Sequence, residues 1–149
     1  MRILLIILLM AVAQSTFSRP LSTDEIQAVE SFIREDMKDP DSAKFYHGEF
    51  PYPQKTAIYC GLVNGKNSFG GYVGKTLFSV LIFEGADNKI DIVSLAHDSA
   101  GKLQTPEALS ALCAGGGYNL PVMKVYENAV NKARERYGIP PIDKNLIVN

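Results

Sequence analysis

Few residues of this chain could act as a nucleophile, a general base or a metal ligand. The histidines are His47 and His97, and the cysteines are Cys60 and Cys113. Cysteine catalysis needs a thiolate beside an imidazole, but Cys60 lies on the apolar face of a predicted strand. Two isolated histidines, without a Cys-x-x-Cys, His-x-x-x-His or Asp-rich loop, do not supply metal ligands at a recognisable spacing. The sequence therefore predicts neither a cysteine enzyme nor a metal site, and no cofactor.

Acidic side chains are the remaining route to catalysis. A glycosidase places two carboxyl groups on either side of the bond that it cleaves, and Glu49, Glu84 and Asp91 are available. Nothing in their spacing separates them from carboxylates on a solvated surface, where most acidic residues lie. A cell-envelope hydrolase that uses unidentified carboxylates therefore stays as an alternative function.

The glycine-rich segment that ends in G-G-Y-V-G-K-T invites comparison with a phosphate-binding P-loop. The P-loop pattern G-x-x-x-x-G-K-[ST] places backbone N–H groups and a lysine around phosphate. Here Phe69 occupies the position of the first required glycine. A strand rather than a helix is predicted after Thr76. Both differences exclude nucleotide binding of this kind.

The loop from Asn64 to Tyr72 has two interpretations. In the first it is architecture, with the asparagines capping backbone groups and the adjacent Gly-Gly pair in left-handed conformations. In the second it is a recognition surface, because aromatic rings give rigid contact area and amides give adaptable hydrogen bonds. The candidate binding residues are Asn64, Lys66, Asn67, Phe69 and Tyr72. Loops often carry binding function, and the second interpretation is preferred.

Two segments of the chain resemble a group of small exported bacterial proteins. The first, from Lys38 to Phe45, reads K-D-P-D-S-A-K-F, and the second, from Cys60 to Gly74, reads C-G-L-V-N-G-K-N-S-F-G-G-Y-V-G. In that group a D-P-x-S-A-x-F turn precedes a C-G-x-V-N-A-K-N-S-F-G-G-Y-x-G segment. Gly65 stands where the pattern has alanine. The resemblance implies an exported compartment and a related fold, and it supplies no catalytic residue.

The N-terminus has the pattern of a secretory signal peptide. Arg2 gives a short positive region, an unbroken apolar run covers residues 3–12, and small residues follow. The run is shorter than the roughly 20 residues that span a bilayer, so a signal anchor is the less favoured alternative. We expect residues 1–18 to form a signal peptide cleaved after residue 13 or 18. The mature protein is then periplasmic or secreted, with no stable membrane span.

Charge and cysteine content narrow the class of partner and the compartment. Loss of Arg2 with the leader leaves 14 of the 15 basic residues against 16 acidic ones. This balance gives no electrostatic signature for nucleic acid. In an oxidising compartment, the pair Cys60 and Cys113 predicts a disulfide bond, although two buried free cysteines are the alternative.

The middle of the chain is rich in strand patterns. We expect a short edge strand over residues 45–50, stopped by prolines, and strands over residues 56–63, 76–84 and 89–95. The Gly85–Asn88 turn makes the last two a hairpin. His97 is expected in the turn after the last strand. The pattern predicts an antiparallel meander.

Helix signals flank these strands. A capping box starting at Ser22 opens a helix that Pro40 must end. Thr105 caps a second helix, and Pro121 opens a third that stops at Gly138. The apolar stripe predicted for the third helix is Val122, Val125, Ala129, Ala133 and Tyr137. Residues 146–148 could dock on the sheet.

These elements predict one α+β domain over residues 19–149. An antiparallel sheet of three or four strands packs with an N-terminal helix and C-terminal helical segments. We expect a non-enzymatic exported protein that presents the Asn64–Tyr72 loop to a protein or envelope ligand. A structural envelope component is a further alternative.

Overall fold

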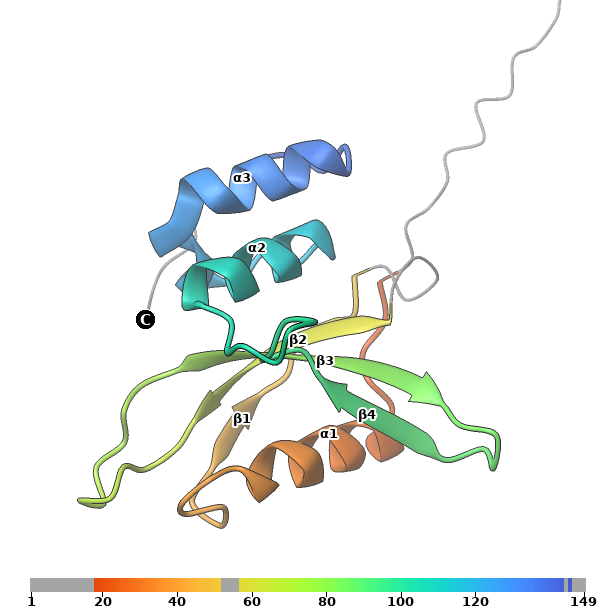
Figure 1. Cartoon of the computed structure of the whole chain (residues 1–149), viewed down its shortest axis with the longest axis vertical. Coiled ribbons are helices and arrows are strands. Elements are labelled where there is room, and N and C mark those ends of the chain that lie inside the picture. Colours follow the sequence, from red (N-terminus) through yellow and green to blue (C-terminus); the bar gives the residue numbers. More distant parts are fainter. Residues whose placement is uncertain (1–17, 52–56, 144, 146–149) are drawn as a thin grey trace, which may run out of the picture.

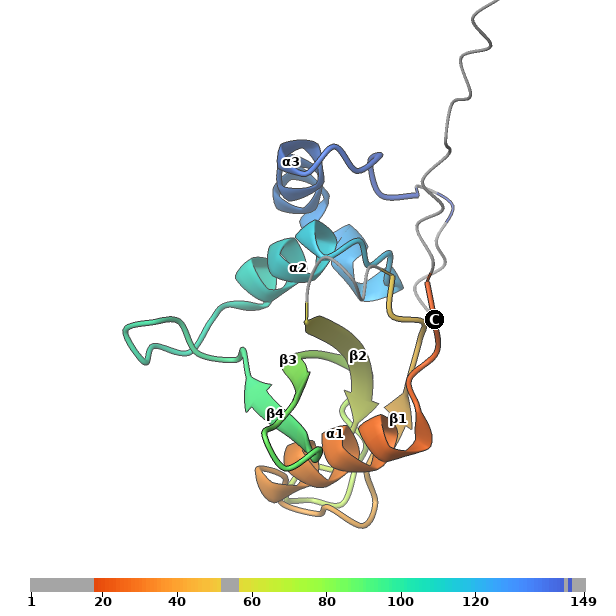
Figure 2. The same ribbon diagram turned by 90° about the vertical axis from the view of Figure 1, so that its right-hand side faces the viewer.

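The computed structural model describes residues 18–51, 57–143 and 145, and it confirms the predicted α+β class. A four-stranded sheet has helix α1 on one face and the helices α2 and α3 above the other (Figure 1). The elements in chain order are α1 Thr23–Glu35, β1 Lys44–Tyr46, β2 Ile58–Asn64, β3 Thr76–Glu84, β4 Ile90–Ser94, α2 Pro106–Gly115, the 3-10 helix η1 Pro121–Tyr126 and α3 Glu127–Arg136. The sheet bends around α1, as Figure 2 shows.

The sheet is the antiparallel meander that the sequence predicts. Its strand order is β1-β2-β3-β4, with every neighbouring pair antiparallel. In β2 the five residues from Tyr59 to Val63 are buried, because both faces of the strand are covered. Strand β1 is shorter than expected, since Phe50 turns away to form an isolated bridge with Arg19.

Helix α1 begins at the predicted capping box. The backbone N–H of Glu25 donates to Ser22 Oγ at 3.2 Å, and the N–H of Ser22 donates to Glu25 Oε2 at 2.8 Å. Arg19 also pairs with Glu25 at 2.7 Å, and the hydrogen bond from Arg19 holds the pKa of this carboxyl below its ordinary value. Val29 anchors the helix in the core with no exposed surface. Helix α1 is therefore stabilised both by its N-terminal capping box and by burial of Val29.

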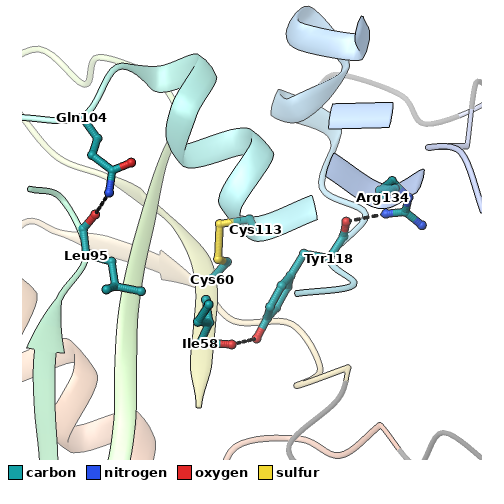
Figure 3. The surroundings of a disulfide bond; sticks show 7 residues. All are labelled: Ile58, Cys60, Leu95, Gln104, Cys113, Tyr118 and Arg134. Carbon is teal, nitrogen blue, oxygen red and sulfur yellow. Dashed lines mark hydrogen bonds between the residues drawn. A yellow bond between two sulfur atoms is a disulfide. The ribbon is translucent and has the colours of Figure 1, made fainter. Parts of the chain in front are cut away.

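A disulfide bond joins the sheet to the upper helical layer. Cys60 of β2 and Cys113 of α2 are both fully buried, with an Sγ–Sγ distance of 2.06 Å. Two hydrogen bonds extend this attachment in Figure 3: Tyr118 Oη donates to the carbonyl of Ile58 at 3.2 Å, and Arg134 Nη1 donates to the carbonyl of Tyr118 at 2.8 Å. The disulfide predicted between Cys60 and Cys113 is therefore confirmed.

The third helical segment differs from its prediction. Pro121 opens a 3-10 helix, and the backbone changes direction at Tyr126 before α3 begins. A 3-10 turn contains 3.0 residues rather than 3.6, so the predicted apolar stripe loses its phase. Val125 and Tyr137 are 72% and 71% exposed. The buried positions are instead Met123, Val130 and Arg134.

Three expectations concern residues that are not described. The leader over residues 1–18 lies outside the described residues except for Ser18, and so does the tail segment 146–148. The start of the second predicted strand, at Thr56, is also outside them. In the described part of the chain, no helix has the length and apolar character needed to cross a membrane.

Candidate binding site at the β2–β3 connection

The connection between β2 and β3 continues as a narrow hairpin beyond the sheet. We call residues 64–75 the arm; it projects beside the turn that follows α1 (Figure 1). Lys66 and Tyr72 form an antiparallel bridge, and the N–H of Val73 donates to the carbonyl of Gly65 at 3.2 Å. At the tip, Asn67 N–H donates to the carbonyl of Gly71 at 2.8 Å. The arm is therefore a structured element rather than an open loop.

The two predicted asparagines brace the arm. Asn67 Oδ1 accepts from the backbone N–H groups of Phe69 at 3.0 Å and Gly71 at 3.1 Å. Asn64 Oδ1 accepts from the N–H of Gly74 at 3.1 Å. These contacts match the architectural interpretation of both asparagines. One detail of that interpretation is wrong: the glycine pair is not left-handed throughout, because Gly70 has a positive φ (81°) whereas Gly71 does not.

The two aromatic residues of the arm have different environments. Tyr72 is 42% exposed, and its hydroxyl donates to the carbonyl of Ser42 at 3.0 Å. That bond ties the arm to the turn after α1. Phe69 is 96% exposed at the tip. Its ring is therefore available to a partner, whereas the ring of Tyr72 is held against the protein.

Lysines from separate segments gather around this arm. The ammonium groups of Lys44 and Lys66 lie 4.5 and 5.5 Å from the centre of the Tyr72 ring. Lys75 lies 4.7 Å from the centre of the Tyr46 ring, and Lys38 Nζ donates to Ser68 Oγ at 2.9 Å. Cation–π contacts of this length are favourable. Of these four lysines, only Lys66 was among the predicted binding residues.

The two segments for which a resemblance to exported bacterial proteins was predicted form one structural unit. The turn after α1 supplies Asp39, whose Oδ2 lies 4.0 Å from Lys66 Nζ, and it supplies the carbonyl that receives the Tyr72 hydroxyl. Gly65, the departure from the pattern, is buried against Met37. A Cβ atom at Gly65 would lie 2.3 Å from Met37 Cε. Glycine therefore fits this position because methionine fills the space beside it.

A second polar cluster lies beneath β1, where Glu30, His47 and Tyr59 form a chain. His47 Nδ1 is 3.0 Å from Tyr59 Oη, and His47 Nε2 is 3.2 Å from Glu30 Oε1. A neutral imidazole satisfies both contacts when Nε2–H donates to the carboxylate and the tyrosine hydroxyl donates to Nδ1. Tyr59 is fully buried, and burial raises its pKa to about 12. Because this hydroxyl is buried, it cannot contact a substrate, and the hydrogen bonds among Glu30, His47 and Tyr59 belong to the packing of the core.

Of the other groups considered for catalysis, Glu84 lines a pocket and His97 lies in the loop after β4. A pocket of about 250 Å³ contains the carboxylates of Glu25 and Glu84. Arg19 lowers the pKa of Glu25, which is the wrong direction for a general acid. His97 bridges Leu103 in the loop after β4, as expected. Among the described residues, no group of three or more His, Cys, Asp or Glu side chains could hold a metal ion.

Comparison of the chain with known proteins found no matching family model, no matching curated protein and no matching solved structure. The resemblance to exported bacterial proteins therefore stays a prediction, and function must be argued from the arm itself.

Proposed function

We propose that this protein is an exported, non-enzymatic binding protein that presents its arm to a partner. The observation that carries the proposal is Phe69, which is 96% exposed on a tip of fixed backbone. Aromatic side chains that are held in place on a rigid element are typical anchors of binding interfaces. Because the tip is already ordered, little conformational entropy is lost when it binds.

The five predicted binding residues have two roles in this proposal. Phe69 supplies contact area at the tip, and Lys66 supplies a charge on the arm next to Tyr72. Asn64, Asn67 and Tyr72 brace the arm through their hydrogen bonds. Substitution of a bracing residue would loosen the arm as well as remove contacts, so its effect on binding would be ambiguous. Substitution at Phe69 removes contact area and leaves those hydrogen bonds in place.

The experiment compares Phe69→Ala with a matched control. Val125→Ala is suitable because Val125 is also apolar and 72% exposed, on η1 rather than on the arm. Mature protein is immobilised and exposed to envelope extract of the producing cells, and bound proteins are compared. We expect wild type and Val125→Ala to retain the same proteins and Phe69→Ala to lose them, with unchanged circular dichroism. Equal capture by Phe69→Ala would contradict the proposal.

Export is supported by two independent features. One is the leader pattern at the N-terminus, and the other is the buried disulfide between Cys60 and Cys113, which is typical of oxidising compartments. Intact mass of the protein isolated from its native compartment tests both. We expect a chain that begins at Gln14 or Arg19 and that gains two alkyl groups only after reduction. An uncut chain with free thiols would refute the proposed compartment.

A further inference from the structure

The pocket at the C-terminal end of β3 brings charges of both signs together. Its volume is about 250 Å³, and it lies at the end of the strand opposite the arm (Figure 1). The charged side chains that line it are Arg19, Glu25 and Glu84. Such a lining suits a polar ligand that carries both a charge and a hydrogen-bonding group.

Arg19 is held firmly in the wall of this pocket. Its backbone N–H donates to the carbonyl of Phe50 at 3.1 Å, and its guanidinium lies 5.4 Å from the centre of the Phe50 ring. Nη1 and Nη2 each donate to an oxygen of Glu25 at 2.7 Å, and Nη1 also donates to the carbonyl of Pro20 at 3.0 Å. The Glu25 side chain is only 9% exposed, so these bonds fix the guanidinium from the protein side.

The same bonds leave one edge of the Arg19 guanidinium for a ligand. A guanidinium has five N–H donors in a fixed fork, and the bonds to Glu25 and Pro20 use those of Nη1 and one of Nη2. The N–H of Nε and the second N–H of Nη2 have no acceptor among the described residues. The Arg19 side chain is 40% exposed, so a ligand can reach this edge. Because Glu25 already balances the charge, the edge suits a neutral carbonyl oxygen better than a full anion.

Glu84 gives the pocket its net charge. It is the last residue of β3, it is exposed, and no ion pair within the described part of the chain involves it. Arg19 and Glu25 neutralise each other, and the nearby cation Lys89 is paired with Asp87 at 2.7 Å. The charged residues that line the pocket therefore sum to one negative charge, which a cationic ligand would balance.

We propose that this pocket binds the amino terminus of a peptide, with the terminal ammonium on Glu84 and the first carbonyl oxygen on Arg19. Capture of a terminal amine is a recurring mode of peptide recognition. The side chain of the bound residue would lie on the apolar part of the lining, which is formed by Phe50, Ile82 and Ile90. A free α-amino acid carries the same ammonium and oxygen, but its carboxylate adds a negative charge to a pocket that is already negative.

This site is separate from the arm and goes beyond the proposed function. The arm ends where β3 begins, at Thr76, and Glu84 is the last residue of that strand. Nine extended residues separate the two ends by roughly 27 Å. Failure of either proposal therefore leaves the other standing.

Titration of the nitrogen-15-labelled mature protein with L-alaninamide, followed by amide NMR at constant ionic strength, tests the inference. Alaninamide carries an ammonium, a carbonyl oxygen and a small apolar side chain, and it has no carboxylate. We expect the backbone amide signals of Ile82, Glu84 and Ile90 to shift with a dissociation constant of about 1 to 10 mM. The affinity is low because an ion pair with an exposed carboxylate contributes little.

Three analogues separate the two contacts. N-acetylalaninamide has no ammonium and propylamine has no carbonyl oxygen, so each should bind at least about threefold more weakly than alaninamide. Free alanine has both groups and an additional carboxylate, and we expect it to bind more weakly as well. Tighter binding of alanine than of alaninamide would overturn the assignment to a peptide and assign the pocket to free amino acids.

Two variants assign the contacts to residues. Glu84→Gln removes the charge at an exposed position and should weaken alaninamide binding about fivefold. The matched control is Glu135→Gln, because Glu135 is also an exposed carboxylate but lies on α3; it should bind like the wild type. Arg19→Lys keeps a cation beside Glu25 and removes the guanidinium edge, so it should weaken alaninamide binding and leave propylamine binding unchanged.

Three results would overturn the inference. One is the absence of shifts in these amide signals up to about 100 mM alaninamide. The others are equal affinity of Glu84→Gln and the wild type, and binding of N-acetylalaninamide as tight as that of alaninamide. If Arg19→Lys fails to fold by circular dichroism, the wild-type comparison of alaninamide with propylamine decides the role of Arg19, and equal affinities would contradict it.

Discussion

Removal of one oxygen atom by Tyr59→Phe tests the polar chain beneath β1. The Tyr59 hydroxyl is hydrogen-bonded to His47 Nδ1 at 3.0 Å in a fully buried position. The His47 side chain is only 17% exposed, so water has poor access to the abandoned nitrogen. A lost hydrogen bond costs about 1 kcal/mol and an unsatisfied buried partner about 1–3 kcal/mol. Phenylalanine keeps the ring contacts and avoids burying a hydroxyl, which offsets part of this cost.

We therefore expect Tyr59→Phe to lower the free energy of unfolding by about 2 kcal/mol, with a fall in melting temperature of about 7 °C. Urea titration followed by circular dichroism measures the free energy. The matched control is Tyr137→Phe, because Tyr137 is 71% exposed; its effect should stay within about 0.5 kcal/mol.

A double-mutant cycle with His47→Phe identifies the source of the cost. In the His47→Phe background the Tyr59 hydroxyl has no imidazole to bond, so its removal no longer leaves Nδ1 of His47 without a partner. Tyr59→Phe should then cost less than about 0.5 kcal/mol in the His47→Phe background. Equal costs in the two backgrounds would refute the assigned hydrogen bond, and a neutral Tyr59→Phe in the wild type would refute the polar chain altogether.

Three further predictions concern other parts of the fold. Replacement of Cys60 and Cys113 by alanine should lower the free energy of unfolding by about 4 kcal/mol, because the bond closes a loop of 53 residues; a urea-measured loss below about 1 kcal/mol would contradict this loop-closure account. Gly65→Ala should change stability by less than about 1 kcal/mol, because the atom it meets is the mobile end of Met37, and a Met37→Ala background should make the alanine stabilising in the same assay. Burial raises the pKa of Tyr59 to about 12 and also raises the pKa of Tyr118. Stability should therefore be unaffected below about pH 10 and fall from there toward pH 12, because the tyrosines of the unfolded chain ionise first. Phenolate absorbance that reached its full value before unfolding would contradict the burial.

Local signals explain why the sequence predicted the fold. The capping box at Ser22, the proline at Pro106 and the four-residue turn before β4 each act within a few residues, and the structure places an element boundary at each. The disulfide was also predictable, because the alternation around Cys60 and the helical position of Cys113 turn both side chains inward. These patterns need no knowledge of distant contacts.

The lysine cluster around the arm could not be predicted in this way. Lys38 and Lys44 reach the arm only because the turn after α1 docks against it, and the register of β1 on β2 sets that approach. The contact of His47 with Glu30 could not be predicted for the same reason, because Glu30 lies 17 residues earlier, on α1. The net charge did not predict the lysine cluster either, because a sum over the whole chain does not record where the charged side chains lie.

The predicted phase of the last helical segment was wrong for a different reason. A helical stripe is read with a constant turn of 3.6 residues, whereas Pro121 starts a tighter 3-10 segment. Each 3-10 residue advances the side chains further around the axis than an α-helical residue does. The sequence contains the proline but no sign of how far the tighter winding continues.

The nearest-neighbour order of the strands has a consequence for how the molecule comes apart. Every strand pairing joins consecutive strands, so the four-stranded sheet by itself has a lower contact order than a sheet with crossovers and can form early. The upper layer of α2 and α3 depends on the link from Cys60 to Cys113, across 53 residues. Reduction of this bond should lower the protection of the α2 and α3 amides from hydrogen exchange before that of β2 and β3. That order of exchange would identify two cooperative units in the described part of the chain, with the arm in the more persistent one.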